Sequence, residues 1–112
     1  GIPTFFILLD NLRFDQWKVM ESAILEYFNK EEESYFYSLL PSATQYSRNA
    51  IFSGLLPIDI AKKYPQWWKN DFDEGGKNMF EAELFNEFIK RNFRKEIKFA
   101  FEKVTNTKTA RL

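Results

Sequence analysis

The stretch Thr4-Phe-Phe-Ile-Leu-Leu9 is a continuous apolar run that ends abruptly at Asp10-Asn11. Runs of this kind are typical of a parallel strand that is buried on both faces of a sheet. The run therefore predicts a strand over residues 4–9. Because such a strand normally lies inside a sheet, and this one stands close to the start of the sequence, we expect the chain to be a segment of a larger domain.

Downstream, the apolar spacing alternates between helical and strand-like. The spacing of Trp17, Met20 and Ile24 predicts a helix, and residues 35–40 predict a second strand that is stopped by Pro41. Strands that alternate with helices predict an α/β layered sheet. The remaining predicted elements are helices over residues 45–52 and 57–63, a polar loop over residues 70–77, a helix that opens with the capping pair Asn78 and Glu81 and ends near Asn92, and a strand over residues 97–101.

The composition indicates a globular chain with balanced charge. Of the 112 residues, 19% are aromatic, which is ample apolar material for a packed core. Lys and Arg number 16 together, as do Asp and Glu, so the positive charge typical of a binder of duplex nucleic acid or anionic membranes is missing. No apolar run is long enough to cross a membrane and no signal peptide is found, so we expect a cytoplasmic protein.

The sequence contains neither cysteine nor histidine. The first absence excludes disulfides, thiolate zinc sites and cysteine nucleophiles. The second removes the usual imidazole base and metal ligand. Hydrolytic sites with two metal ions generally combine carboxylates with imidazoles, so these residues supply at most part of such a site.

Two polar residues stand at the ends of predicted strands. Asp10 follows the first strand, and Thr44 lies just beyond the second strand, at the start of a predicted helix. Ligands in open α/β sheets gather beyond the carboxyl ends of the strands, so we expect both side chains to face one crevice. The amide groups and the dipole at the start of the helix favour a phosphate there.

Two stretches resemble the PglZ domain, a family of the alkaline-phosphatase superfamily. They are Phe6-Ile-Leu-Leu-Asp-Asn-Leu-Arg-Phe-Asp-Gln-Trp17 and Leu40-Pro-Ser-Ala-Thr-Gln-Tyr-Ser-Arg-Asn-Ala-Ile-Phe-Ser-Gly54. The chain is most similar to the PglZ output domain of PorX-type response regulators, which are associated with type IX secretion. The resemblance implies an α/β/α layered sheet of alkaline-phosphatase type, with residues 1–112 as its N-terminal segment. The superfamily's further Asp and His ligands have no counterpart here, so the resemblance also implies truncation.

The resemblance implies a role for each candidate residue. Asp10 would bind zinc or a similar divalent metal ion, and Thr44 would be the metal-bound nucleophile of a phosphoester hydrolase. Ser42 stands where the family motif has threonine and is a lesser candidate. A cation partly held by a carboxylate favours the alkoxide form of a threonine hydroxyl. The residues expected to contact the phosphate are Arg13, Arg48, Asn11 and Asn49.

Each assignment has a structural alternative. Asp10 and Asn11 are also typical of a turn after a strand, and Thr44 is typical of a helix start. Arg13 and Arg48 can each pair with a carboxylate instead of a phosphate.

The resemblance and the composition point to three functions, and the first is the one that the resemblance implies. The first is a phosphodiesterase, with nucleotides among its substrates, inside a two-component signalling protein that controls secretion; the present segment alone is expected to be inactive. The second is a regulatory output module that binds other proteins and has a structural or degenerate metal site. The third is a binding fragment whose exposed apolar faces drive self-association.

Overall fold

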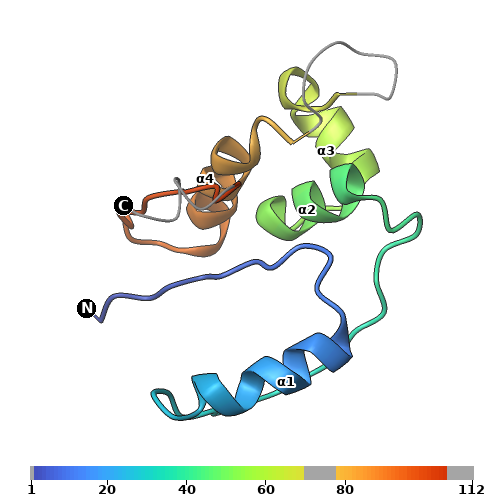
Figure 1. The fold of residues 1–112 in the computed structure, drawn as a ribbon. Helices are drawn as coiled ribbons and strands as arrows, with labels where there is room; N and C mark the ends of the chain where they lie inside the picture. Colours follow the sequence, from blue (N-terminus) through green and yellow to red (C-terminus); the bar gives the residue numbers. More distant parts are fainter. Residues whose placement is uncertain (1, 70–77, 106–112) are drawn as a thin grey trace. The chain divides into compact units, whose positions relative to one another are not determined.

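All regular structure in residues 2–69 and 78–105, the residues described by this computed structural model, is helical (Figure 1). The chain divides into two units, Gly1–Tyr37 (unit 1) and Ser38–Leu112 (unit 2). The predicted loop over residues 70–77 lies outside the described residues. The elements are α1 (Phe14–Ile24), α2 (Thr44–Ser53), α3 (Pro57–Lys63), the short 3-10 helix η1 (Pro65–Trp67) and α4 (Glu81–Asn92).

The prediction of an α/β layered sheet is wrong for the part of the chain that the structure describes. Residues 4–9, 35–40 and 97–101 run without regular structure, and none of them pairs with a neighbour as a strand. A helix closes its hydrogen bonds within itself, whereas a strand needs a second strand beside it. An apolar run shows that a segment suits a buried strand, but it does not show which segment lies next to it.

Unit 1 contains the helix α1 between two irregular segments, which confirms the helix predicted from Trp17. A turn at Asp10 and Asn11 precedes it, and Asn11 adopts a left-handed conformation with a φ of 61°. Asparagine tolerates this conformation better than most residues. Arg13 is the N-cap residue of α1. Its backbone N–H donates to Oε1 of Gln16 in the first turn, at 3.0 Å.

A network of charges fastens the segment after α1 back onto the helix. Lys18 and Lys30 each contact both Glu21 and Glu33, at nitrogen-to-oxygen distances between 2.7 and 3.5 Å. Hydrogen bonds from Lys30 and from the hydroxyl of Tyr35 lower the pKa of Glu33 to about 2. The stabilising effect of Glu33 is therefore complete above the ordinary pKa of a glutamate and is lost as the pH falls toward 2.

Unit 2 is built on α2, which packs against both α3 and α4. Its described core consists of apolar side chains from these helices, with the indole of Trp67 packed against them. The structure confirms the helices predicted over residues 45–52 and 57–63 and the helix end near Asn92. Pro57 opens α3, as is typical of proline in the first turn of a helix. The buried apolar residues are Phe52, Ile60, Tyr64, Leu84 and Ile89.

Gly54 ends α2 in the left-handed conformation, with a φ of 68°. Glycine is the residue that adopts this conformation without a steric cost. A Cβ atom at this position would also lie 2.7 Å from the ring of Phe88 on α4. The close approach of α4 to the end of α2 therefore depends on the missing side chain.

The segment after α4 also packs on the helices of unit 2, although it is not a strand. The ring of Phe99 meets Phe85 edge-on at 5.3 Å between centroids, and Phe101 meets Phe52 in the same manner at 5.2 Å. Edge-to-face packing at these distances is favourable for aromatic rings. The alternation over residues 97–101 therefore marks the side of the segment that contacts α2 and α4.

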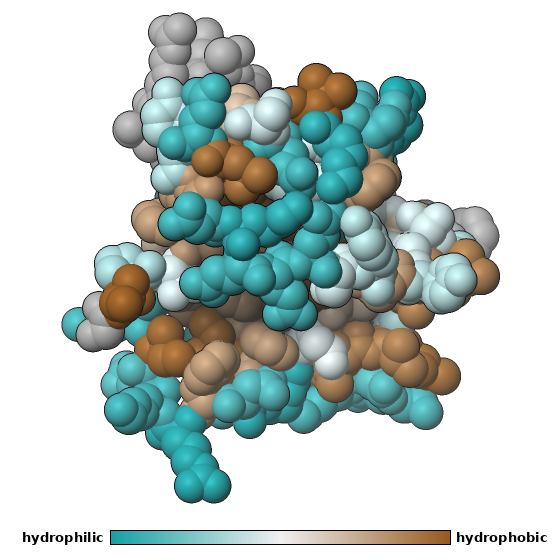
Figure 2. Space-filling view, turned by 90° about the horizontal axis from the view of Figure 1, so that it is seen from below, coloured by the Kyte–Doolittle hydropathy of each residue, from teal (hydrophilic) through white to brown (hydrophobic). Residues whose placement is uncertain are grey.

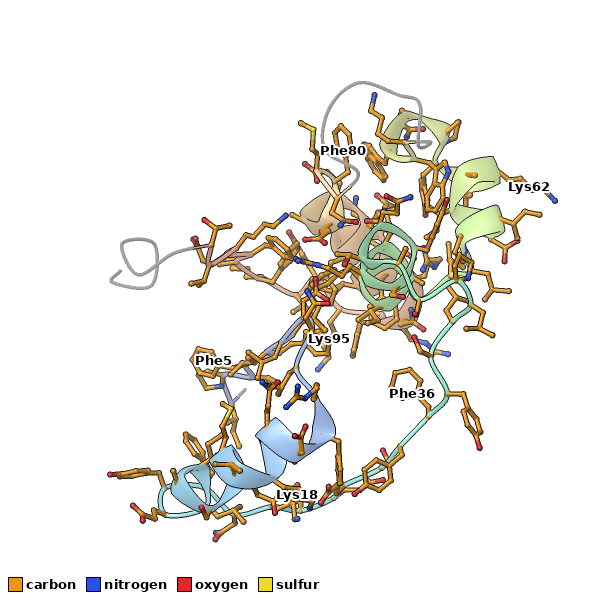
Figure 3. All side chains as sticks on the ribbon, turned by 45° about the vertical axis from the view of Figure 1, so that its right-hand side comes forward. Phe5, Lys18, Phe36, Lys62, Phe80 and Lys95 are labelled. Atoms are coloured by element: carbon orange, nitrogen blue, oxygen red, sulfur yellow. The ribbon has the colours of Figure 1, made fainter. Side chains whose placement is uncertain are left out.

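Large apolar side chains remain exposed in many places. No residue of α1, which lies wholly within the described ranges, is buried. Phe5 and Phe36, which stand on the irregular segments of unit 1, are 85% and 84% exposed (Figure 3). Figure 2 shows hydrophobic side chains interspersed with hydrophilic ones on the face that it presents. None of the helices within residues 2–69 and 78–105 has the length and apolar character needed to cross a membrane.

We expect the 112-residue chain in isolation to self-associate, because exposed apolar surface beyond that of an ordinary monomer is removed from water by contact between copies. Sedimentation velocity over a range of concentrations should show a rising average mass. Phe5→Ser combined with Phe36→Ser should lower this association, whereas Lys62→Ala, at an exposed polar position of α3, should not. A monomer at all concentrations would contradict the expectation.

Candidate functional site

Thr44 is the first residue of α2, which agrees with its predicted place at a helix start. The intrahelical hydrogen bonds begin with the backbone N–H groups of Tyr46 and Ser47, which both donate to the carbonyl of Ala43 at 3.0 Å. The amide of Thr44 therefore precedes the first intrahelical bond. The first turn of α2 carries no acidic side chain, so its positive dipole end is not offset there by a carboxylate.

Ser42 and Asn49 lie on either side of Thr44 in the sequence and differ in their surroundings. Ser42 is exposed between the bend at residues 40–41 and the start of α2. Asn49 is 2% exposed and belongs to the interior of unit 2. Of the two, Ser42 is the side chain that an external ligand reaches without a rearrangement.

Arg48 forms a buried ion pair with Glu81, the first residue of α4. Its Nη2 donates to Oε2 of Glu81 at 2.8 Å, and its Nε lies 2.7 Å from Oε1 without the alignment of a second hydrogen bond. The side chains are 17% and 1% exposed. The expected pairing of Glu81 with Asn78 at a helix cap is therefore wrong, since Phe80 occupies the cap and Glu81 faces α2.

A second polar contact holds the other end of α2 on α4. Nη1 of Arg91, in the last turn of α4, donates to the hydroxyl of Tyr64 at 3.1 Å, and Nη2 donates to the backbone carbonyl of Ser53. The helix α2 is thus tied to α4 at its middle, through Arg48, and at its C-terminal end, through the carbonyl of Ser53. Because the first turn of α4 meets α2 at Arg48 and its last turn meets Ser53, the two helices run in the same direction.

The candidates of unit 1 lie around the turn before α1. Asp10 and Asn11 form the turn and are exposed. The guanidinium of Arg13 donates to both carboxylate oxygens of Asp15 at 3.0 Å, which holds the pKa of Asp15 below its usual value. Arg13 thus makes the carboxylate contact that the sequence left open as an alternative. That the turn shares a crevice with Thr44 stays a prediction.

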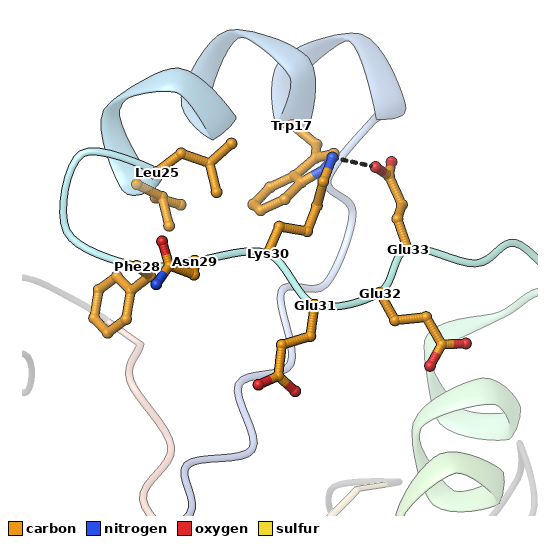
Figure 4. Close-up of a pocket in the computed structure, with 9 residues that line it drawn as sticks. Trp17, Leu25, Phe28, Asn29, Lys30, Glu31, Glu32 and Glu33 are labelled. Carbon is orange, nitrogen blue, oxygen red and sulfur yellow. Dashed lines mark hydrogen bonds and ion pairs between the residues drawn. The ribbon is translucent and has the colours of Figure 1, made fainter.

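Unit 1 also carries an open hollow of about 520 Å³ beneath α1 (Figure 4). Its lining includes Glu31 and Glu32, and the ion pair of Lys30 with Glu33 lies at one side. None of the residues predicted to act on phosphate lines it. The apolar residues of the lining are Trp17, Ile24, Leu25 and Phe28.

The described side chains do not complete a site for a divalent metal ion. Within residues 2–69 and 78–105, no three carboxylate, imidazole or thiolate groups come together. Catalytic zinc sites typically have three protein ligands, and magnesium sites need converging oxygen atoms. Asp10 with Thr44 is too small a set for either ion.

The chain matches the BREX system PglZ alkaline phosphatase-like domain over residues 3–112, and it belongs to the PglZ family. This membership confirms the predicted family and implies a hydrolase as the parent domain; the PorX-type relationship stays a prediction. No curated protein matches the chain.

We predict that Arg48→Met lowers the free energy of unfolding by about 3–5 kcal/mol, because it leaves the carboxylate of Glu81 buried without its counter-charge. Combining it with Glu81→Leu should recover most of this loss, since an apolar pair avoids the cost of burying charge. Chemical denaturation of the three proteins measures both effects.

The matched control is Glu87→Gln on the same helix, where the contact of Glu87 with Lys90 at 3.3 Å is more exposed. This variant should lose no more than about 1 kcal/mol. Equal losses for Arg48→Met and Glu87→Gln would show that the Arg48–Glu81 pair does not behave as a buried one.

Proposed function

We propose that the full-length protein hydrolyses phosphoesters, with phosphodiesters such as nucleotides as the substrate class, and that Thr44 is its nucleophile. The observation that supports this most directly is the position of Thr44 as the first residue of α2 in a chain of the PglZ family. A threonine at this point brings its hydroxyl and the first helical amides to the same place. Amides at a helix start bind phosphoryl oxygens well.

The proposed reaction proceeds by displacement at phosphorus. The Oγ1 atom of Thr44 forms a new bond to phosphorus while the bond from phosphorus to the leaving oxygen breaks, and water later releases the phosphoryl group from the threonine. Negative charge on the phosphoryl oxygens is stabilised by the helix amides at the start of α2. The side chain of Ser42, two positions earlier, is a second hydroxyl within this segment.

The proton of the threonine hydroxyl needs an acceptor or a nearby cation before attack. The sequence contains no histidine for that task. Alkaline phosphatase-like proteins usually employ metal ions, and zinc or a similar divalent ion is our proposal for the full-length protein. Asp10 is the carboxylate that we assign to it, with the remaining ligands contributed by other residues.

The phosphate-binding assignments are ranked by what the structure shows of each side chain. Arg13 and Asn11 are exposed at the turn before α1, and both are compatible with contact to a substrate. Asn49 is buried within unit 2, which leaves it a weaker candidate. Arg48 is engaged with Glu81, so we assign it a different role below.

A second candidate function is a regulatory module that binds proteins and whose metal site is structural or degenerate. It is favoured by the exposed aromatic side chains of unit 1 and by the small set of potential ligands in the described residues. A cytoplasmic signalling protein of the PorX type, acting in secretion, is compatible with either function. The zinc content and the phosphodiesterase activity of the full-length protein separate the two.

We predict that Thr44→Val in the full-length protein lowers kcat for a chromogenic phosphodiester by at least about a thousandfold, because it removes the attacking oxygen. Valine nearly preserves the shape of threonine, so circular dichroism should remain unchanged. Ser42→Ala is the matched control and should retain most of the activity. Retained turnover in Thr44→Val would reject Thr44 as the nucleophile.

We further predict that Asp10→Asn weakens zinc binding by the full-length protein at least about tenfold, because the substitution removes a negative charge from the proposed ligand. Equilibrium dialysis followed by metal analysis measures this change. Asp59→Asn, at an exposed carboxylate in the first turn of α3, is the control and should bind zinc normally. Unchanged zinc stoichiometry and affinity in Asp10→Asn would count against its role as a ligand.

A further inference from the structure

We infer that the ion pair of Arg48 with Glu81 positions the hydroxyl of Thr44 by fixing the rotation of α2 about its own axis. The inference rests on the proposed role of Thr44 as nucleophile. Thr44 and Arg48 are four residues apart on α2, so their side chains lie on the same face of the helix. A contact that holds Arg48 therefore also orients the face that carries Thr44.

The contact at the other end of α2 does not have this effect. Arg91 holds the backbone carbonyl of Ser53, which lies in the last turn of α2 and far along the helix from Thr44. A single hydrogen bond to the backbone at the C-terminal end constrains the orientation of Thr44 less directly than a side-chain contact one turn away. The Arg48–Glu81 pair adds a side-chain contact one turn from Thr44, with Glu81 itself fixed by its burial at the start of α4.

Small rotations of the helix are large on the scale of catalysis. A rotation of about 20° moves a Cα atom at the helix radius by about 0.8 Å, and a side-chain oxygen farther from the axis by more than that. Misplacement of a reacting group by about 1 Å costs on the order of a hundredfold in rate. Loss of a contact that fixes the rotation of α2 should therefore lower kcat by a measurable factor.

The surroundings of Arg48 favour positioning over contact with the substrate. Its Nη2 and Nε atoms both face the carboxylate of Glu81, and the two side chains are largely buried. The carboxylate offsets the charge of the guanidinium, which leaves little net attraction for an anionic phosphate. Glu81 occupies the positive end of α4, where its own charge is favourable.

The test compares kcat and KM of the full-length protein with those of two single variants, Arg48→Lys and Glu81→Gln. Lysine keeps the charge but loses the planar fork of the guanidinium, and glutamine keeps the shape but loses the charge. The double variant Arg48→Met with Glu81→Leu replaces the pair with an apolar contact. Glu87→Gln on α4 is the control, and all assays run at a temperature where each protein is folded.

A second readout is independent of activity. Selective methyl labelling of threonine gives an NMR signal for Thr44, which is assigned by its absence in Thr44→Val. We expect this signal to shift or broaden in the single variants and to return toward its original position in the double variant. The control Glu87→Gln should leave it unchanged.

We expect each single variant to lower kcat about tenfold to a hundredfold with KM changed less than about twofold, and the double variant to regain most of kcat. A raised KM, with kcat not regained in the double variant, would show that Arg48 contacts the substrate and would overturn the inference. Unchanged kcat and an unchanged Thr44 signal in both single variants would also overturn it.

Failure of the proposed function gives a different result. In that case the unmodified protein does not hydrolyse phosphodiesters, or Thr44→Val keeps full activity. The Thr44 methyl signal then decides the positioning inference alone, and a signal insensitive to Arg48→Lys and Glu81→Gln rejects it.

Discussion

The packing of α2 on α4 encloses one buried charge, the carboxylate of Glu81. Burial of a carboxylate is unfavourable unless an opposite charge and hydrogen bonds compensate it, and in unit 2 that charge is Arg48. A shift of either helix by one turn would separate the two groups and leave Glu81 without its partner. The apolar residues of the core pack around the same helices, and the ion pair adds the requirement that Arg48 and Glu81 meet.

The helices were predictable because their signals are local. Pro57 at the start of α3 and Gly54 at the end of α2 mark boundaries through the conformations that these residues favour. The expected sheet was not confirmed because pairing is a relation between segments. The residues over 97–101 illustrate the difference, since their alternation predicted a strand, but the segment contacts helices through Phe99 and Phe101.

The candidate site was predictable to a similar degree. The place of Thr44 at a helix start follows from the polar turn after Pro41. The role that the resemblance to PglZ domains implies for this residue stays a prediction. The engagement of Arg48 was open, because an arginine on a helix is equally suited to a phosphate or a carboxylate. Nothing in one sequence indicates that its partner is Glu81, since acidic residues near a helix start are common and are usually exposed.

Each of the two units is stabilised internally by forces that respond differently to salt. In unit 1 the return of residues 30–35 to α1 relies on lysine–glutamate contacts that are partly open to solvent. Dissolved ions screen such contacts, because the Debye length falls to about 3 Å at 1 M salt. The apolar core of unit 2 is not weakened in this way, and excluded salts such as sulfate strengthen it. High ionic strength therefore lowers the stability of unit 1 more than that of unit 2. The helix α2, with Thr44 at its start, keeps its packing under these conditions.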